Sequence, residues 1–290
     1  MRLLILLLFP ALAFGQKNCT GSVIDETTGK PVPYASIGLV KQNRGVSAGE
    51  DGTFRIEVLF PAADSFRISS VGYEPKLVAV AGWKDGTPVT LKQKGPLDEV
   101  VILSHRPQQV YTLNRFGHCS SHWHWVGLEA VYQRAQRIES PEPGLFLNGL
   151  ELCKDGSESI FRIRIYDVDP VTGGPSRDLA DTVIEVRSKE SHVSIDLETY
   201  RIAIPGKAFF VAIEWLFIPF NEDVQVTRHK GKKVEHTYYK PAMRSVNDRH
   251  LKPGHLWQMN FRGTWEEAYQ SYANTNFQIT AKMARYGEKF

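Results

Sequence analysis

Apolar residues recur at every second position in many short segments of the chain, and this alternation limits the folds that it can adopt. Phe54, Ile56 and Val58 alternate with Arg55 and Glu57, so an extended segment here has one apolar side and one polar side. Turn-forming residues separate such segments roughly every 8–12 positions. Helical periodicity is confined to stretches of about three turns or fewer. The pattern predicts an all-β protein made of stacked sheets.

The alternation continues in the second half of the chain. Phe161, Ile163 and Ile165 lie at alternate positions, as do Val193 and Ile195. About ten such segments follow one another, which indicates a two-sheet, jelly-roll-like β-sandwich.

Residues 1–15 have the features of a secretory signal peptide. Arg2 supplies a positive charge, an apolar run over 3–9 follows, and the small residues Ala13 and Gly15 precede the expected cleavage. The run is far shorter than the ~20 apolar residues that span a bilayer. We therefore expect an exported protein that is periplasmic, outer-membrane-associated or secreted.

Length, charge and composition restrict the function classes. The net charge of +3 argues against a dedicated nucleic-acid binder, and 42% hydrophobic residues suffice for real cores. Residues 208–220 are the most apolar later segment, but Glu214 interrupts them and they are too short to span a membrane. The 290 residues suit two domains. We expect a signal peptide over 1–15, a first sandwich over 16–103, a linker over 104–117 and a second sandwich over 118–290.

Four segments of the first half resemble the carboxypeptidase regulatory-like domain. They are GSVIDETTGKPVPYASIGLV, GEDGTFRIEV, FRISSVGYEP and LDEVVI, in that order. The resemblance implies a prealbumin-like Greek-key sandwich of the kind found at the N-terminus of exported Bacteroidetes proteins. It implies an accessory module without zinc ligands of its own, so the resemblance does not imply peptidase activity.

The second half is similar to the β-sandwich that follows this module in uncharacterised exported Bacteroidetes proteins. The segments RIRIYDVDPVTGGPSRDL and FFVAIEWL carry that similarity. It brings no known activity with it.

Histidines cluster just after the expected linker, at His118, His122 and His124. Two histidines two positions apart share one face of a strand, and such pairs bind zinc or copper. No carboxylate stands at the spacing of a zinc hydrolase. The alternative is that the histidines line a sheet face while Trp123 and Trp125 fill the core.

Asp167, Asp169 and Asp178 surround a Gly-Gly turn. Oxygen-rich loops of this kind hold Ca²⁺, although the EF-hand spacing is missing. Aspartate and glycine are also what a tight turn needs, so both interpretations stay open.

Three cysteines remain after export, and an odd number cannot pair completely within one chain. Cys119 and Cys153 fall in the same expected domain and are the preferred disulfide. The alternative is three buried free thiols.

Two further groups are candidate binding residues. Arg228, Lys230, Lys232 and Lys233 make one hairpin end basic, and this end either meets an anionic partner or is a solvated loop. Trp257 and Trp265 lie near turns, and they either stack on sugars or pack in the core.

The expected function is non-enzymatic binding or assembly at the bacterial cell envelope, with no catalytic residues and no cofactor. The partner would be an envelope protein or a glycan. A carbohydrate-binding protein and a metal-dependent hydrolase built on the three histidines are the alternatives, with Zn²⁺ or Ca²⁺ as the candidate ions.

Overall fold

A computed structural model describes the protein over residues 16–59, 64–95, 103–120, 123–128, 130–180, 182–229, 232–248, 250–251, 253–268 and 275–288. The expected signal peptide, residues 1–15, lies outside these ranges. Within them, the helical segments are the two 3-10 turns η2 (Glu198–Tyr200) and η3 (Pro219–Asn221), and everything else regular is strand. The prediction of an all-β sandwich protein is confirmed.

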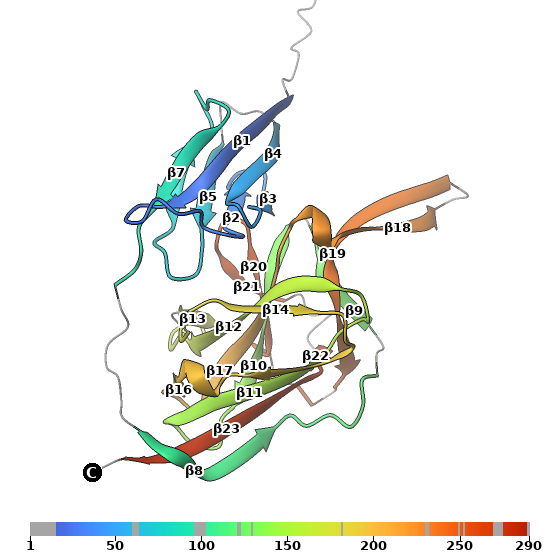
Figure 1. The fold of residues 1–290 in the computed structure, drawn as a ribbon. Coiled ribbons are helices and arrows are strands. Elements are labelled where there is room, and N and C mark those ends of the chain that lie inside the picture. Colours follow the sequence, from blue (N-terminus) through green and yellow to red (C-terminus); the bar gives the residue numbers. More distant parts are fainter. Residues whose placement is uncertain are drawn as a thin grey trace, which may run out of the picture.

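The N-terminal module contains seven described strands in two sheets (Figure 1). The strands are β1 (Gln16–Asp25), β2 (Ser36–Leu39), β3 (Arg44–Ser47), β4 (Thr53–Leu59), β5 (Ser65–Ser69), β6 (Lys76–Ala79) and β7 (Thr87–Leu91). One sheet has the order β4-β1-β7 and the other the order β3-β2-β5-β6. Phe54, Ile56 and Val58 are buried in the core of this module, as their alternation predicts.

The C-terminal module contains the remaining described strands. They are β8 (Leu103–Leu113), β9 (Trp123–Gly127), β10 (Val131–Glu139), β11 (Leu145–Cys153), β12 (Ser159–Val168), β13 (Pro175–Asp178), β14 (Ile184–Ser188), β15 (His192–Asp196), β16 (Ile202–Ile204), β17 (Ala208–Trp215), β18 (Glu222–His229), β19 (Lys232–Asn247), β20 (Leu256–Asn260), β21 (Trp265–Glu267), β22 (Thr275–Phe277) and β23 (Ile279–Glu288).

Two large sheets of the C-terminal module enclose its core. In one, the order β13-β12-β17-β10-β20-β21 is extended by β14, which pairs with β12. In the other, the order is β15-β11-β23-β8, and β16 pairs with β11. A third sheet has the order β18-β19-β22, with β9 on β19. Trp215 and Phe161 are among the fully buried side chains of the core.

Most of the expected linker, 104–117, is a strand rather than a linker. Residues up to Leu113 belong to β8, which pairs with β23 at the end of the chain. The segment is largely polar and exposed, so it lacks the apolar alternation of a half-buried strand. Its backbone hydrogen bonds come from a partner that is distant in sequence, and no local pattern shows that pairing.

The two modules contact each other directly. Ser47 donates its backbone N–H to the carbonyl oxygen of Phe217 (3.1 Å), and the N–H of Phe217 donates to Oγ of Ser47 (3.0 Å). Gly38 and Gly45 lie so close to Phe261 that a Cβ on either would be 2.4 Å from it. Tight packing at glycine holds the N-terminal module against one end of the C-terminal sandwich (Figure 1).

Candidate functional site

One face of the seven-stranded sheet turns away from the core and carries polar side chains; we call it the outer face. In the register of the sheet, Arg162 lies opposite Glu214, which lies opposite Gln133, and Arg164 lies opposite Ala212. Because side chains alternate along a strand, these residues share one side of the sheet. Ile163 and its alternate neighbours occupy the core side. The outer face of the sheet is therefore polar, whereas the core side of the same sheet is apolar.

A continuous hydrogen-bonded network connects these side chains. Nη1 of Arg164 donates to Oε2 of Glu214 (2.9 Å) and its Nε donates to Oδ2 of Asp178 (2.8 Å). Nε2 of Gln133 donates to the same oxygen of Glu214 (2.8 Å), and the hydroxyl of Tyr166 donates to Oε1 of Gln133 (2.8 Å). Networks satisfied in this way are rigid, so their groups stay aimed in fixed directions.

The surroundings strongly shift the pKa values of Arg164 and Tyr166 in this network. Although burial opposes its charge, the neighbouring Tyr166, Asp178 and Glu214 raise the pKa of Arg164 well above its ordinary value. Burial raises the pKa of Tyr166 far above its usual range. The guanidinium therefore stays charged and the phenol stays a hydrogen-bond donor throughout the physiological pH range.

A cleft of about 780 Å³ opens between this network and the N-terminal module. Its N-terminal wall includes Ser36, Arg67, Ser69, Tyr73, Gln93 and Lys94, and its opposite wall includes Tyr132, Gln133, Arg164, Tyr166, Arg177, Asp178 and Glu214. The volume lies within the range of sites for small ligands. Donors, acceptors and aromatic rings line it together, and both modules contribute.

Asp25 fixes two side chains of the N-terminal wall. Its Oδ2 accepts hydrogen bonds from the hydroxyl of Tyr73 (2.8 Å) and from Nε2 of Gln93 (2.5 Å). The backbone N–H of Thr28, and then Gln93 and Tyr73, hold the pKa of Asp25 well below its usual range. Asp25 is thus a charged anchor that positions this wall of the cleft.

The two candidate tryptophans pack on the outer face beside the cleft. Trp257 and Trp265 are half-buried and lie against the cluster of Ala135, Ala212, Phe210 and Tyr166. Trp265 meets the ring of Tyr166 edge to face at 5.2 Å between centroids. Neither tryptophan is among the residues that line the cleft. They support Tyr166, which does line it.

Of the three candidate metal ligands, His118 alone has a described side chain. His118 is exposed and its carbonyl accepts a hydrogen bond from Gln278 (3.0 Å), whereas His124 lies in β9 opposite Arg244. His122 lies outside the described residues. No group of three or more histidines, cysteines, aspartates or glutamates that could hold a metal occurs in the part of the chain that the structure describes.

The three candidate calcium ligands have other hydrogen-bond partners. Oδ1 of Asp169 accepts from the backbone N–H groups of Val171 (2.8 Å) and Thr172 (2.9 Å), which closes the turn. Oδ1 of Asp167 accepts from its neighbour's N–H (2.8 Å), and Asp178 pairs with Arg164. These contacts account for the aspartates as turn and network residues.

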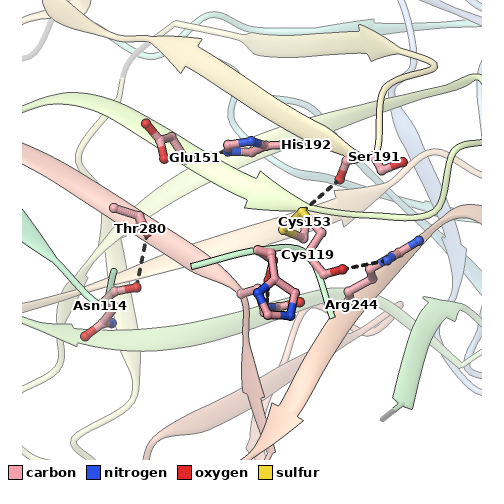
Figure 2. Close-up of a disulfide and its surroundings, with 10 residues drawn as sticks. Asn114, Cys119, Glu151, Cys153, Ser191, His192, Arg244 and Thr280 are labelled. Carbon is pink, nitrogen blue, oxygen red and sulfur yellow. Dashed lines mark hydrogen bonds and ion pairs between the residues drawn. A yellow bond between two sulfur atoms is a disulfide. The ribbon is translucent and has the colours of Figure 1, made fainter. Parts of the chain in front are cut away.

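Cys119 and Cys153 form a disulfide (Figure 2), with their Cα atoms 5.6 Å apart. This is the pair that the sequence favours. The segment around it is further fixed by Arg244, whose Nη1 donates to the carbonyl of Cys119 (3.0 Å). Cys19 is a buried free thiol in the N-terminal core.

The basic hairpin is a two-stranded ribbon that projects from the body of the molecule (Figure 1). We define the ribbon as residues 222–229 and 232–237. Arg228, Lys232 and Lys233 are exposed near its end, and Lys230 lies outside the described residues. None of its described residues lines the cleft.

The sequence analysis did not select Arg164, Glu214 and Gln133 as site residues, and it considered Asp178 only as a candidate calcium ligand. One signal was present: Glu214 is a single charge in the most apolar run, and arginines alternate along Phe161–Tyr166. A buried charge needs a partner of opposite sign. The pairing of these two segments could therefore have been inferred from charge.

The fold and cleft define a β-sandwich protein with two modules and a shared cleft. Residues 19–102 match the family model of the CarboxypepD_reg-like domain, so the resemblance of the first half is confirmed. No curated protein sequence matches the chain. Among the described residues, no helix is long and apolar enough to cross a membrane.

Three solved structures show distant likeness to the chain. The cysteine protease and lectin-like domains of Cwp84, a surface layer associated protein of Clostridium difficile, are 13% identical with a TM-score of 0.35, over 55% of this chain and 33% of that one. Clostridial Cwp84 after propeptide cleavage is 12% identical with a TM-score of 0.36, over 83% of this chain and 51% of that one. This chain thus spans about a third to a half of those proteins.

The third structure is a protein from Bacteroides uniformis ATCC 8492 that is provisionally named a carbohydrate-binding protein. It is 13% identical, with a TM-score of 0.19, over 78% of this chain and 96% of that one. All three TM-scores are below 0.5, so no argument about ligand or activity follows from these structures.

Proposed function

We propose that this protein is an exported, non-enzymatic binding protein of the bacterial cell envelope, and that it holds a saccharide in the cleft between its modules. The observation that carries the proposal is the network of Arg164, Glu214, Gln133 and Tyr166 along one wall. Gln133, Tyr166 and Glu214 are buried, and the network holds the partly exposed side chains of Arg164 and Asp178 in fixed positions. The exposed Ser176 and Arg177 and the half-buried ring of Tyr73 line the same cleft. Such a mixture suits a ligand that has many hydroxyl groups and a few C–H faces.

The chemistry of the cleft supports binding rather than hydrolysis. Both of its carboxylates, Asp178 and Glu214, accept hydrogen bonds from Arg164. Hydrolysis of a glycosidic bond by a carboxylate pair requires one of the two to donate a proton. Two carboxylates bonded to one guanidinium are suited to orient a ligand instead.

Two observations support export. The sequence of residues 1–15 has the features of a signal peptide. The disulfide between Cys119 and Cys153 is typical of proteins in an oxidising compartment, such as the periplasm or the cell surface.

Binding of saccharides to purified residues 16–290, measured by isothermal titration calorimetry across a panel of oligosaccharides, tests the proposal. Ser176 is exposed and lines the cleft, so Ser176→Trp fills the space and should abolish binding. Val171 is 91% exposed in the same hairpin but outside the cleft, and Val171→Trp should bind like the parent protein. Absence of binding to the whole panel, or equal binding by both variants, contradicts the proposal.

A further inference from the structure

The cleft carries an excess of positive charge. Its lining includes the cations Arg67, Lys94, Arg164 and Arg177 but only the two carboxylates Asp178 and Glu214. We propose that the cleft selects an anionic saccharide, one that carries carboxylate or sulfate groups. This inference rests on the proposed function and names the ligand class of the same site.

The two carboxylates do not neutralise the excess. Both pair with Arg164, through an ion pair of 2.9 Å to Glu214 and a closer contact to Asp178. Glu214 is only 6% exposed in its side chain, so it lies beneath the cleft surface. The network thus accounts for one cation and both anions of the lining.

The other three cations have no carboxylate partner among the described residues. Arg67 donates from Nη1 to Oγ of Ser69 (3.0 Å), which is a neutral partner. The ion pairs of the described chain include neither Lys94 nor Arg177. Arg67 is half-buried, so its charge is only partly screened by water and gains more from an incoming anion than a fully solvated cation would.

These cations come from both walls. Arg67 lies in β5 of the N-terminal module and Lys94 follows β7, whereas Arg177 lies in β13 of the C-terminal module. An anionic group between the walls is attracted from two sides, and the low-dielectric walls concentrate that field. Guanidinium groups also bind carboxylate and sulfate through two parallel hydrogen bonds. Hydroxyl recognition by the network and charge recognition by the cations then act on one ligand.

Calorimetric titration of residues 16–290 with three probes of similar length separates the ligand classes. The probes are an oligogalacturonate, which carries carboxylates, a heparin-derived oligosaccharide, which carries sulfates, and a neutral dextran oligosaccharide. We expect at least one anionic probe to bind about tenfold or more tightly than dextran, since a charged hydrogen bond contributes more than a neutral one. This advantage should shrink as NaCl is raised.

Variants that each remove one positive charge show which cations bind the anionic probe. Arg177 is exposed, so Arg177→Ala leaves the fold intact and should weaken the anionic probe about tenfold while leaving dextran unchanged. Arg67→Gln should act in the same direction from the other wall. Arg228→Ala, which removes an exposed cation from the ribbon, is the matched control and should leave both probes unchanged.

The outcomes separate the inference from the proposed function. If dextran binds as tightly as the anionic probes and Ser176→Trp abolishes that binding, the inference is overturned and the saccharide function stands. If an anionic probe is weakened by Arg228→Ala but not by Arg177→Ala, the charge recognition belongs to the ribbon, and the inference is likewise overturned. If no saccharide binds, the proposed function itself fails.

Discussion

The outer face of the seven-stranded sheet and the ribbon are both formed by antiparallel strands with polar and apolar residues, but the two regions differ in burial. Polar and apolar residues alternate in β12 of the sheet and in β18 of the ribbon, and both strands are antiparallel to their neighbours. β12 is mostly buried, whereas residues 232–237, which pair with β18, are all exposed. Burial in these strands therefore depends on what covers them, and the N-terminal module and the aromatic cluster of Trp257 and Tyr166 cover the outer face.

The charges of the two regions also behave differently. On the outer face, Arg164 is paired with two carboxylates and only 15% of its side chain is exposed. On the ribbon, Arg228 lies opposite Lys233, which carries the same charge, and both are solvated. Val226 on the same strand is 52% exposed. The charge of Arg164 is thus structural, whereas that of Arg228 is solvated.

The largest expected effect comes from Arg164→Ala. Removal of the guanidinium leaves Asp178 without its ion-pair partner and leaves Glu214 with the hydrogen bond from Gln133 and the longer ion pair to Arg162 (3.8 Å). Breaking a buried pair in this way costs about 3–5 kcal/mol. Arg228→Ala should change the free energy of unfolding by less than about 0.5 kcal/mol. Urea denaturation followed by tryptophan fluorescence measures both values. Equal effects of the two variants would show that the outer face is no more dependent on charge pairing than the ribbon.

The disulfide comes next in expected effect. It closes a loop with a sequence separation of 34 between Cys119 and Cys153, just before β9, the strand that pairs with the base of the ribbon's β19. The double variant Cys119→Ala with Cys153→Ala should be less stable by about 3 kcal/mol. Reducing agent should destabilise the parent protein and leave the double variant unchanged. A response of the double variant to reductant would count against this assignment.

Disruption of the contact between the modules should have the third-largest effect. Gly38→Val places a side chain where a Cβ is already 2.4 Å from the carbonyl oxygen of Phe261, and overpacking of this kind costs about 1–3 kcal/mol. The variant should also expose the outer face and weaken ligand binding in the cleft. Gly117→Ala is the control, since nothing lies within 4 Å of its Cβ position. Differential scanning calorimetry and the cleft titration check both effects.

The smallest expected effect is a pH dependence confined to the N-terminal module. The native pKa of Asp25 is lowered, so the unfolded state takes up a proton first as pH falls. The stabilisation is complete above the unfolded value of about 3.9 and is lost as pH falls from there through the native pKa. Denaturation curves between about pH 2 and pH 6 should show this loss in the parent protein. Asp25→Asn should abolish that part of the dependence.

Alternation and turn spacing were sufficient to predict the all-β fold and the buried set Phe54, Ile56 and Val58. They could not predict β8, because its pairing depends on β23 at the far end of the chain. They also did not predict that the alternate positions of β12 are covered, since a period of two gives two faces but says nothing about a second module over one of them. The cleft lies where the two modules meet, and the local pattern of residues along a strand does not predict that contact.

The position of β23 between β11 and β8 has a consequence for the order in which the molecule can be completed. The N-terminal core uses strands that end with β7 at Leu91, so that half has all its parts early in synthesis. The larger core cannot close until Ile279–Glu288 has left the ribosome, because Ile279, Ala281 and Met283 are part of it. A nascent chain therefore carries a complete N-terminal core and an open C-terminal core, whose apolar strands need protection from aggregation until Ile279–Glu288 has emerged.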